Sequence, residues 1–132
     1  MQNKIDISLI NYKFFGGNYI IYETKTKGKE FYGYNDKLKY EGEYLNGKRH
    51  GKGKEYLWDG TLSYEGEYLN NKKNGKGKEY NYRDKLIFEG EYLNGKRWNG
   101  NGYDNNNNII YELKNGKGSI KEYNNSGKLG FE

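Results

Sequence analysis

Apolar and polar positions alternate over short stretches of this chain, which is the pattern of half-buried β-strands. In the segment 38–45, every second residue from Leu38 to Tyr44 is apolar or glycine, and the residues between them are charged. Because successive side chains of a strand point to opposite faces, this segment predicts one aromatic face and one charged face. A turn-like cluster at 46–50 follows, a second strand is predicted at 51–56, and Asp59-Gly60 favours a tight hairpin turn after it.

The same pattern returns after 24 residues. The motif at 40–44 recurs at 64–68 and, with Phe in place of the first Tyr, at 88–92. Self-similarity at a fixed period of this size indicates a repeat architecture, in which each unit buries its apolar face only against its neighbours. Each unit predicts two strands and two turns. The chain is therefore expected to be all-β, as an elongated, twisted antiparallel sheet built from tandem hairpins.

Packing of aromatic rings explains why the predicted strands contain glycine. A position without a side chain lets a ring from the neighbouring strand lie over the backbone. We therefore expect a continuous aromatic stack along one face, and Glu43 opposite Lys52 or Lys54 on the other. The positions that carry this packing are Tyr40, Gly42, Tyr44, Gly51, Gly53, Tyr64, Gly66, Tyr68, Gly75, Gly77, Phe88, Gly90 and Tyr92.

The copies lose regularity towards both ends of the chain. We expect residues 1–27 to form N-terminal strands, as a degenerate repeat or a cap, and residues 28–132 to form the repeat array. The best copies begin at 40, 64 and 88.

Beyond residue 97, the sequence suggests one inserted residue near Trp98 and a shortened unit from Tyr111. The segment Lys128–Glu132 copies the opening of a strand, and a terminal strand with unpaired backbone groups predicts self-association.

Composition alone is typical of disorder, since hydrophobic residues make up only 33%, the mean hydropathy is −1.28, and Ala and Val are absent. Against this, aromatics reach 17%, with 16 Tyr that recur in register. Tyrosine buries a large ring while its hydroxyl stays hydrated, which favours an ordered but shallow fold. No apolar run is long enough to cross a bilayer and no signal peptide is recognisable, so we expect a cytoplasmic location, with association at the cytosolic face of a membrane as the alternative.

The motif Tyr-x-Gly-x-Tyr followed by Gly-x-x-x-Gly-x-Gly resembles the MORN repeat (membrane occupation and recognition nexus). The resemblance is clearest at 40–53 and 64–77, extends from about Gly28 to Glu132, and is closest to the variant repeat of bacteria, protists and large DNA viruses. It implies an elongated antiparallel sheet used for scaffolding, self-association, or attachment to proteins and phospholipids. In this family catalytic parts lie outside the repeats.

Two surfaces are candidates for binding. The first is a basic row from equivalent loops, able to contact an anionic partner or lipid headgroups, or alternatively only to solubilise the turns: Lys48, Arg49, Lys72, Lys73, Lys96 and Arg97. The second is an aromatic set expected beside lysines on the charged face, as a protein-binding surface or as simple packing: Tyr56, Trp58, Tyr80 and Tyr82. Glutamates on that face would repel phosphates, which argues against nucleic acid as the partner, although the net charge is +5.

Nothing in the sequence indicates catalysis or metal binding. The chain has no Cys and a single His, His50, without a counterpart in the other repeats. The pair Glu41 and Glu43 recurs in every unit beside lysine, a repetition that acid–base catalysis does not require. We expect no catalytic residue, no cofactor and no metal site.

The leading hypothesis is a non-enzymatic scaffold or protein-interaction module that also forms homo-oligomers. The alternative is a peripheral membrane module that binds phosphoinositides. A weaker alternative, implied by the resemblance, is an antitoxin-like protein that neutralises a toxin by binding it.

Overall fold

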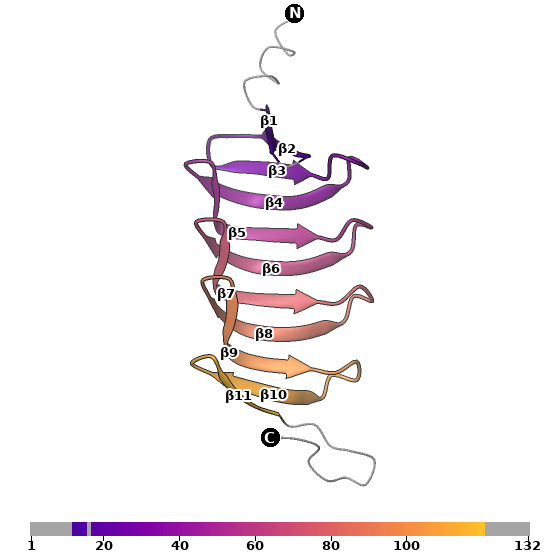
Figure 1. Cartoon of the computed structure of the whole chain (residues 1–132), viewed down its shortest axis with the longest axis vertical. Coiled ribbons are helices and arrows are strands. Elements are labelled where there is room, and N and C mark those ends of the chain that lie inside the picture. Colours follow the sequence, from indigo (N-terminus) through magenta and orange to yellow (C-terminus); the bar gives the residue numbers. More distant parts are fainter. Residues whose placement is uncertain (1–11, 16, 121–132) are drawn as a thin grey trace, which may run out of the picture.

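The strands of the chain form one antiparallel sheet in which each strand pairs with its neighbours in sequence (Figure 1). The computed structural model describes residues 12–15 and 17–120, and this part contains eleven strands and no helix. The predicted all-β sheet of tandem hairpins is confirmed. The strands are β1 (Tyr12–Phe15), β2 (Asn18–Tyr22), β3 (Lys27–Phe31), β4 (Leu38–Leu45), β5 (Lys48–Tyr56), β6 (Leu62–Leu69), β7 (Lys72–Tyr80), β8 (Leu86–Leu93), β9 (Lys96–Tyr103), β10 (Ile109–Lys114) and β11 (Lys117–Ile120).

Two kinds of turn connect the strands, one kind at each side of the sheet where the strands end. The turn between β4 and β5 contains Asn46 and Gly47 with φ of 52° and 77°. Two successive positive φ values are typical of the two-residue hairpin turn that Asn-Gly favours. The β6–β7 turn uses Asn70 and Asn71 with similar φ values, because Asn tolerates the left-handed region better than most residues.

The turns at the other edge are longer. Between β5 and β6, Leu57 donates its N–H to the Thr61 carbonyl at 2.8 Å, and Gly60 donates to the Leu57 carbonyl at 2.9 Å. Only Gly60 has a positive φ, of 94°. The tight turn expected at Asp59-Gly60 is therefore present, within a connection that spans residues 57–61. These turns stack above one another along the right-hand side of Figure 1.

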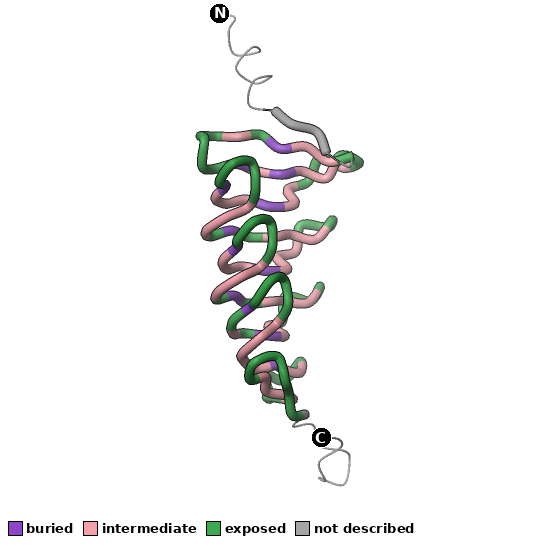
Figure 2. Tube along the Cα trace, turned by 60° about the vertical axis from the view of Figure 1, so that its left-hand side comes forward, coloured by how far each residue is buried: buried purple, intermediate pink, exposed green. Residues whose placement is uncertain are grey.

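A chain of ring contacts forms the core, which we call the aromatic spine. Its six rings are Tyr40, Tyr44, Tyr64, Tyr68, Phe88 and Tyr92, all at most 3% exposed. Within a repeat, Tyr40 meets Tyr44 at 5.5 Å between centroids, and across repeats it meets Tyr68 at 5.2 Å. All contacts within the spine are edge-to-face, an arrangement that the aromatic quadrupole favours. The continuous stack is confirmed, and Figure 2 shows buried positions recurring at each level.

Glycines provide the space for these rings. Gly66 pairs with Gly53 on one side and with Gly77 on the other. A Cβ atom at Gly66 would lie 2.5 Å from the Gly77 Cα and 2.6 Å from the Tyr64 hydroxyl. At Gly53 a Cβ would collide with the Tyr40 ring. Aromatic packing over glycine is therefore what the structure shows.

The pairing register overturns two details of the sequence interpretation. β9 contains 8 residues where β7 contains 9, and Gly100 pairs with Gly90 as Gly77 does. Relative to the preceding repeat, the segment around Trp98 therefore lacks one residue and has not gained one. The Trp98 ring packs against Gly116, where a Cβ atom would lie 2.6 Å from the ring.

The second detail concerns Glu43. The register shifts after Gly42, so Glu43 lies opposite Lys27 of β3 and has no partner residue on β5. Its carboxylate accepts the backbone N–H of Lys52 at 2.6 Å. The strand-opening copy at Lys128–Glu132 lies outside the described residues.

Candidate functional site

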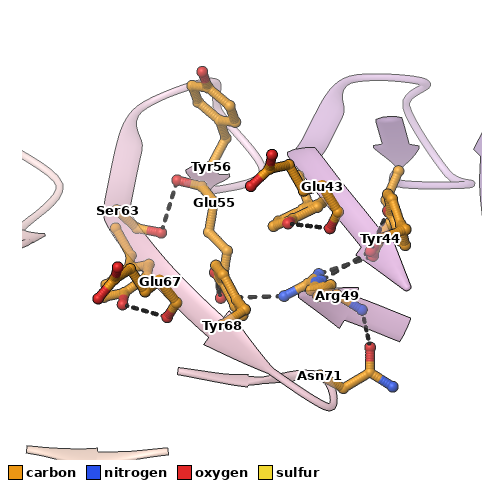
Figure 3. Close-up of polar contacts among 12 residues, drawn as sticks. Glu43, Tyr44, Arg49, Glu55, Tyr56, Ser63, Glu67, Tyr68 and Asn71 are labelled. Carbon is orange, nitrogen blue, oxygen red and sulfur yellow. Dashed lines mark hydrogen bonds and ion pairs between the residues drawn. The ribbon is translucent and has the colours of Figure 1, made fainter. Parts of the chain in front are cut away.

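The aromatic face of the sheet also buries an ion-pair network. Arg49 lies over the Tyr40 ring at 4.3 Å from the centroid and donates twice to the Glu30 carboxylate at 2.8 Å. The Arg49 side chain is 12% exposed and that of Glu30 only 4%. Arg49 also contacts Glu55 at 3.1 Å, and Glu55 accepts the Tyr68 hydroxyl (Figure 3).

Burial opposes ionisation of Glu30, but hydrogen bonds from Arg49 and Tyr44 and the Arg49 charge outweigh it, so the pKa of Glu30 lies below its ordinary value. The same arrangement recurs two periods later, at the other end of the spine. Arg97 donates to both oxygens of Glu79 at 2.8 and 3.0 Å, and the pKa of Glu79 is lowered in the same way. These pairs therefore stabilise the fold as charged groups.

The six residues of the expected basic row consequently fall into two groups. Arg49 is engaged in the buried pair with Glu30, Arg97 in the part-buried pair with Glu79, and the Lys73 ammonium lies 4.5 Å from the centroid of the Tyr64 ring. The other three, Lys48, Lys72 and Lys96, are exposed at the first position of their strands. A single row of six cations at one edge is therefore not what the structure presents.

A leucine lies directly across from each exposed lysine. Leu45 pairs with Lys48, Leu69 with Lys72, and Leu93 with Lys96. The leucines are 48%, 42% and 41% exposed. We call these six residues the Leu/Lys edge; they combine apolar and cationic groups at each level of the stack.

The charged face is hollowed into a groove of about 1000 Å³ that runs from β3 to β8. Glycines pair with one another across its middle, so its floor is bare backbone. These glycines are Gly42, Gly53, Gly66, Gly77 and Gly90. Its sides are carboxylates on β4, β6 and β8 and lysines on β5 and β7, in alternating stripes.

The stripes are in register with one another. Lys54 lies opposite Glu41 on one side and Glu65 on the other, and Lys52 lies opposite Glu67. At the β9 end the lysine positions are replaced, and Asn99 donates to the Glu91 carboxylate at 2.9 Å. The groove thus presents a regular alternation of charge that ends in an acidic stripe.

The aromatic set expected on this face is divided by the structure. The Tyr56 hydroxyl donates to Glu41 at 2.5 Å and the Tyr80 hydroxyl to Glu65 at 2.8 Å, so both bind groove carboxylates. Burial and these hydrogen bonds raise the pKa of both tyrosines to about 12. Trp58 and Tyr82 lie apart, in the long turns, and are 62% and 67% exposed.

Sequence reasoning missed Tyr34. It lies one period before Trp58, in the turn between β3 and β4, and is 73% exposed. The 24-residue spacing is a signal that could have found it, but the first unit diverges from the repeat motif around this position.

The described residues contain no group of histidine, cysteine and acidic side chains able to hold a metal ion. Within the same part of the chain, no helix is long and apolar enough to cross a membrane. Glu43 and Glu67 both accept backbone N–H groups, so their carboxylates have a structural role.

The model of the MORN repeat matches residues 40–61, 64–81 and 88–99, the segments that build β4 to β9. This chain carries MORN repeats. MORN repeats are generally modules for interaction with proteins and membranes. A comparison with curated proteins gives no match.

Among solved structures, this chain is similar to the crystal structure of TarM. The TM-score is 0.46 at 15% sequence identity, over 89% of this chain and 22% of the TarM chain. The chain therefore spans about a fifth of the length of TarM.

Proposed function

We propose that this protein is a non-enzymatic interaction module that holds a segment of a partner protein in the groove of its charged face. The groove itself carries the proposal. Its size, about 1000 Å³, is at the upper end of what binding pockets usually enclose. Charged side chains of both signs line it, so a partner segment can be held by complementary charges.

The two faces of the sheet differ in burial, and this difference supports the groove as the binding surface. The aromatic face is filled by the spine and its buried ion pairs, with Tyr40, Tyr64 and Phe88 fully buried. In the described structure no layer covers the opposite face, and its lysines are exposed. Stability therefore comes from one face, and the other remains accessible.

The charge stripes supply selectivity. Strands lie about 4.8 Å apart, so a carboxylate stripe recurs about every 9.6 Å along the groove. A partner segment that runs along the groove can therefore match successive stripes where its own charged side chains recur at about that spacing on one face. Charge complementarity of this kind selects partners more than it raises affinity.

Site-directed photo-crosslinking tests the proposal, because the chain has no Cys and accepts a single labelled thiol. Lys54→Cys and Lys78→Cys place the label in the groove, and Lys72→Cys places it at the Leu/Lys edge as the matched control. We expect the two groove positions to capture the same protein and the edge position not to capture it. Capture from the edge position alone would contradict the proposal.

Contact with an anionic membrane is the second candidate, and the Leu/Lys edge favours it. Each exposed lysine near a membrane surface contributes about 1 kcal/mol, so three give roughly 3 kcal/mol before the leucines insert. Vesicles containing phosphatidylserine or phosphoinositide should sediment with the protein at low salt.

The triple variant Lys48→Glu, Lys72→Glu and Lys96→Glu should lose this binding. Charge reversal at the groove lysines Lys54 and Lys78 should leave it unchanged. Wild-type protein that stays in the supernatant at low salt would eliminate the membrane candidate.

A further inference from the structure

Three large aromatic side chains are displayed to solvent at one edge of the sheet. They are Tyr34, Trp58 and Tyr82, which are 73%, 62% and 67% exposed. Each lies four residues before the next strand, in the turns 32–37, 57–61 and 81–85, which we call the aromatic turns; the first of these is one residue longer than the others. None of the groove-lining residues lies in these turns, so this surface is separate from the groove.

Hydrogen bonds connect the first of these turns to the second level, and the third turn to the turn that follows it. Tyr32 donates its hydroxyl to the Tyr56 carbonyl at 2.7 Å, and the Asn35 amide donates to the Trp58 carbonyl at 3.0 Å. The Asn81 amide donates to Asn105 of the following turn at 3.3 Å. Figure 1 shows these turns aligned along the long axis of the molecule. The rings are therefore presented on a supported row.

The spacing of the three rings matches one backbone conformation of a peptide ligand. Two strands at about 4.8 Å each place equivalent positions about 9.6 Å apart along the stack. A polyproline II helix completes a turn in three residues and rises about 9.3 Å in doing so. Residues i, i+3 and i+6 of such a helix therefore face successive rings. Proline-rich segments dock on aromatic-lined surfaces in this way because little conformational entropy remains to be lost.

Polar groups at the row match the needs of that ligand. A polyproline II helix makes no internal hydrogen bonds, so its carbonyl groups accept from outside. Among the described residues, the Trp58 indole N–H and the Tyr82 hydroxyl have no hydrogen-bond partner, and both can donate.

Charge distinguishes the middle turn from its neighbours. The first turn contains Asp36 and Lys37, and the third contains Asp84 flanked by Arg83 and Lys85. The middle turn, 57–61, contains the exposed Asp59 and no cation. A Lys or Arg beside the ligand residue over Trp58 would complement that carboxylate.

We infer that the aromatic turns bind a proline-rich segment in the polyproline II conformation, with proline at every third residue and a basic residue beside the central proline. Successive prolines pack on Tyr34, Trp58 and Tyr82. The Trp58 N–H donates to a ligand carbonyl, and Asp59 contacts the basic residue.

The test is a titration of the full chain with a synthetic peptide of about four Pro-x-x repeats that carries one central Arg. Calorimetry and tryptophan emission should both show saturable binding. A peptide of the same composition with proline at every fourth residue should bind at least about tenfold more weakly. Equal binding of the two peptides, or no saturable response up to about 1 mM, would overturn the inference.

Variants locate the site. Trp58→Ala should weaken binding by about tenfold or more, and Trp58→Phe by no more than about threefold, because a ring is retained. Leu69→Ala, at the opposite edge of the sheet, is the matched control and should bind like the wild type. Trp58 is exposed, so circular dichroism of Trp58→Ala should match the wild type.

Two further outcomes decide between ligands. Asp59→Asn should weaken binding of the Arg peptide at low salt but leave a peptide with Gln in place of Arg unaffected. A linear glucan oligosaccharide also has apolar faces that stack on aromatic rows. Binding of the glucan together with failure of the peptide would contradict the inference and assign the row to sugars.

Discussion

The Arg49 guanidinium in β5 binds the Glu30 carboxylate in β3 through two contacts of 2.8 Å, across the intervening strand β4. With the edge-to-face rings beneath it, this pair ties three strands together on one face. In the part of the chain that the structure describes, no second layer covers the sheet, so contacts between strands two apart stabilise it as a packed layer does in larger folds.

Removal of the Arg49 side chain should destabilise the protein far more than removal of the neighbouring Lys48 side chain. Arg49→Ala leaves Glu30 as a buried charge without its partner, which typically costs about 3–5 kcal/mol of the free energy of unfolding. Lys48→Ala, one residue earlier, removes an exposed cation and should change stability by less than about 0.5 kcal/mol. Urea denaturation of both variants measures the difference. Similar midpoints for the two would contradict the structural role of Arg49.

Substitution of a glycine beneath the rings should be equally destabilising. Gly66→Val places a branched side chain against the Gly77 backbone and the Tyr64 hydroxyl, so we expect a loss of about 2–4 kcal/mol despite the β-propensity of valine. Gly47→Asn is the matched control, because Gly47 has open space around it and the next repeat has Asn71 there. A neutral or stabilising Gly66→Val in denaturation experiments would refute packing at that position.

Stability should fall in acid. The folded-state pKa values of Glu30 and Glu79 are lowered, so their contribution is complete above the unfolded-state pKa of about 4.3. As the pH falls through about 4.3 towards the lowered values, the folded protein must take up protons and this contribution is lost. Denaturation midpoints between about pH 7 and pH 3 report the effect.

The double variant Glu30→Gln and Glu79→Gln should be less stable than the wild type at neutral pH and should lose less stability in acid. A wild-type midpoint that does not fall in acid would count against the buried pairs.

Tyrosine titration offers a test of the groove geometry. Burial and the hydrogen bond to Glu41 raise the pKa of Tyr56 to about 12, and Glu65 does the same for Tyr80. Glu41→Gln should lower the pKa of Tyr56 and leave that of Tyr80 in place, as measured by ring resonances in NMR. Unchanged Tyr56 titration in that variant would show that the hydroxyl does not contact Glu41.

The sequence was sufficient to predict the spine. The motif at 40–44 and its copies specify a ring, a glycine and a ring on one face at a fixed period, and strand alternation then leaves few arrangements of Tyr40, Tyr64 and Phe88. Each of them is fully buried in the structure.

The position of Arg49 could not be recognised in the same way. Lys48 and Arg49 are adjacent cations in an apparent loop, and only the start of β5 at Lys48 makes them alternate, with Lys48 outward and Arg49 over the Tyr40 ring. The register shift after Gly42 was also hidden, because it depends on pairing with β5 and has no local signal in β4. Strand alternation predicted glutamates and lysines on one face, but which of them pair, such as Glu41 with Lys54, depends on that register.

The central claim is that the charged face binds the partner protein. Calorimetry with the protein captured by the groove crosslinks tests it most directly, comparing Lys54→Glu/Lys78→Glu with Lys48→Glu/Lys72→Glu, which carry the same change in net charge. The account predicts that the groove variant loses at least about tenfold in affinity and that the edge variant stays within about twofold. A loss confined to the edge variant, with full affinity in the groove variant, would contradict it.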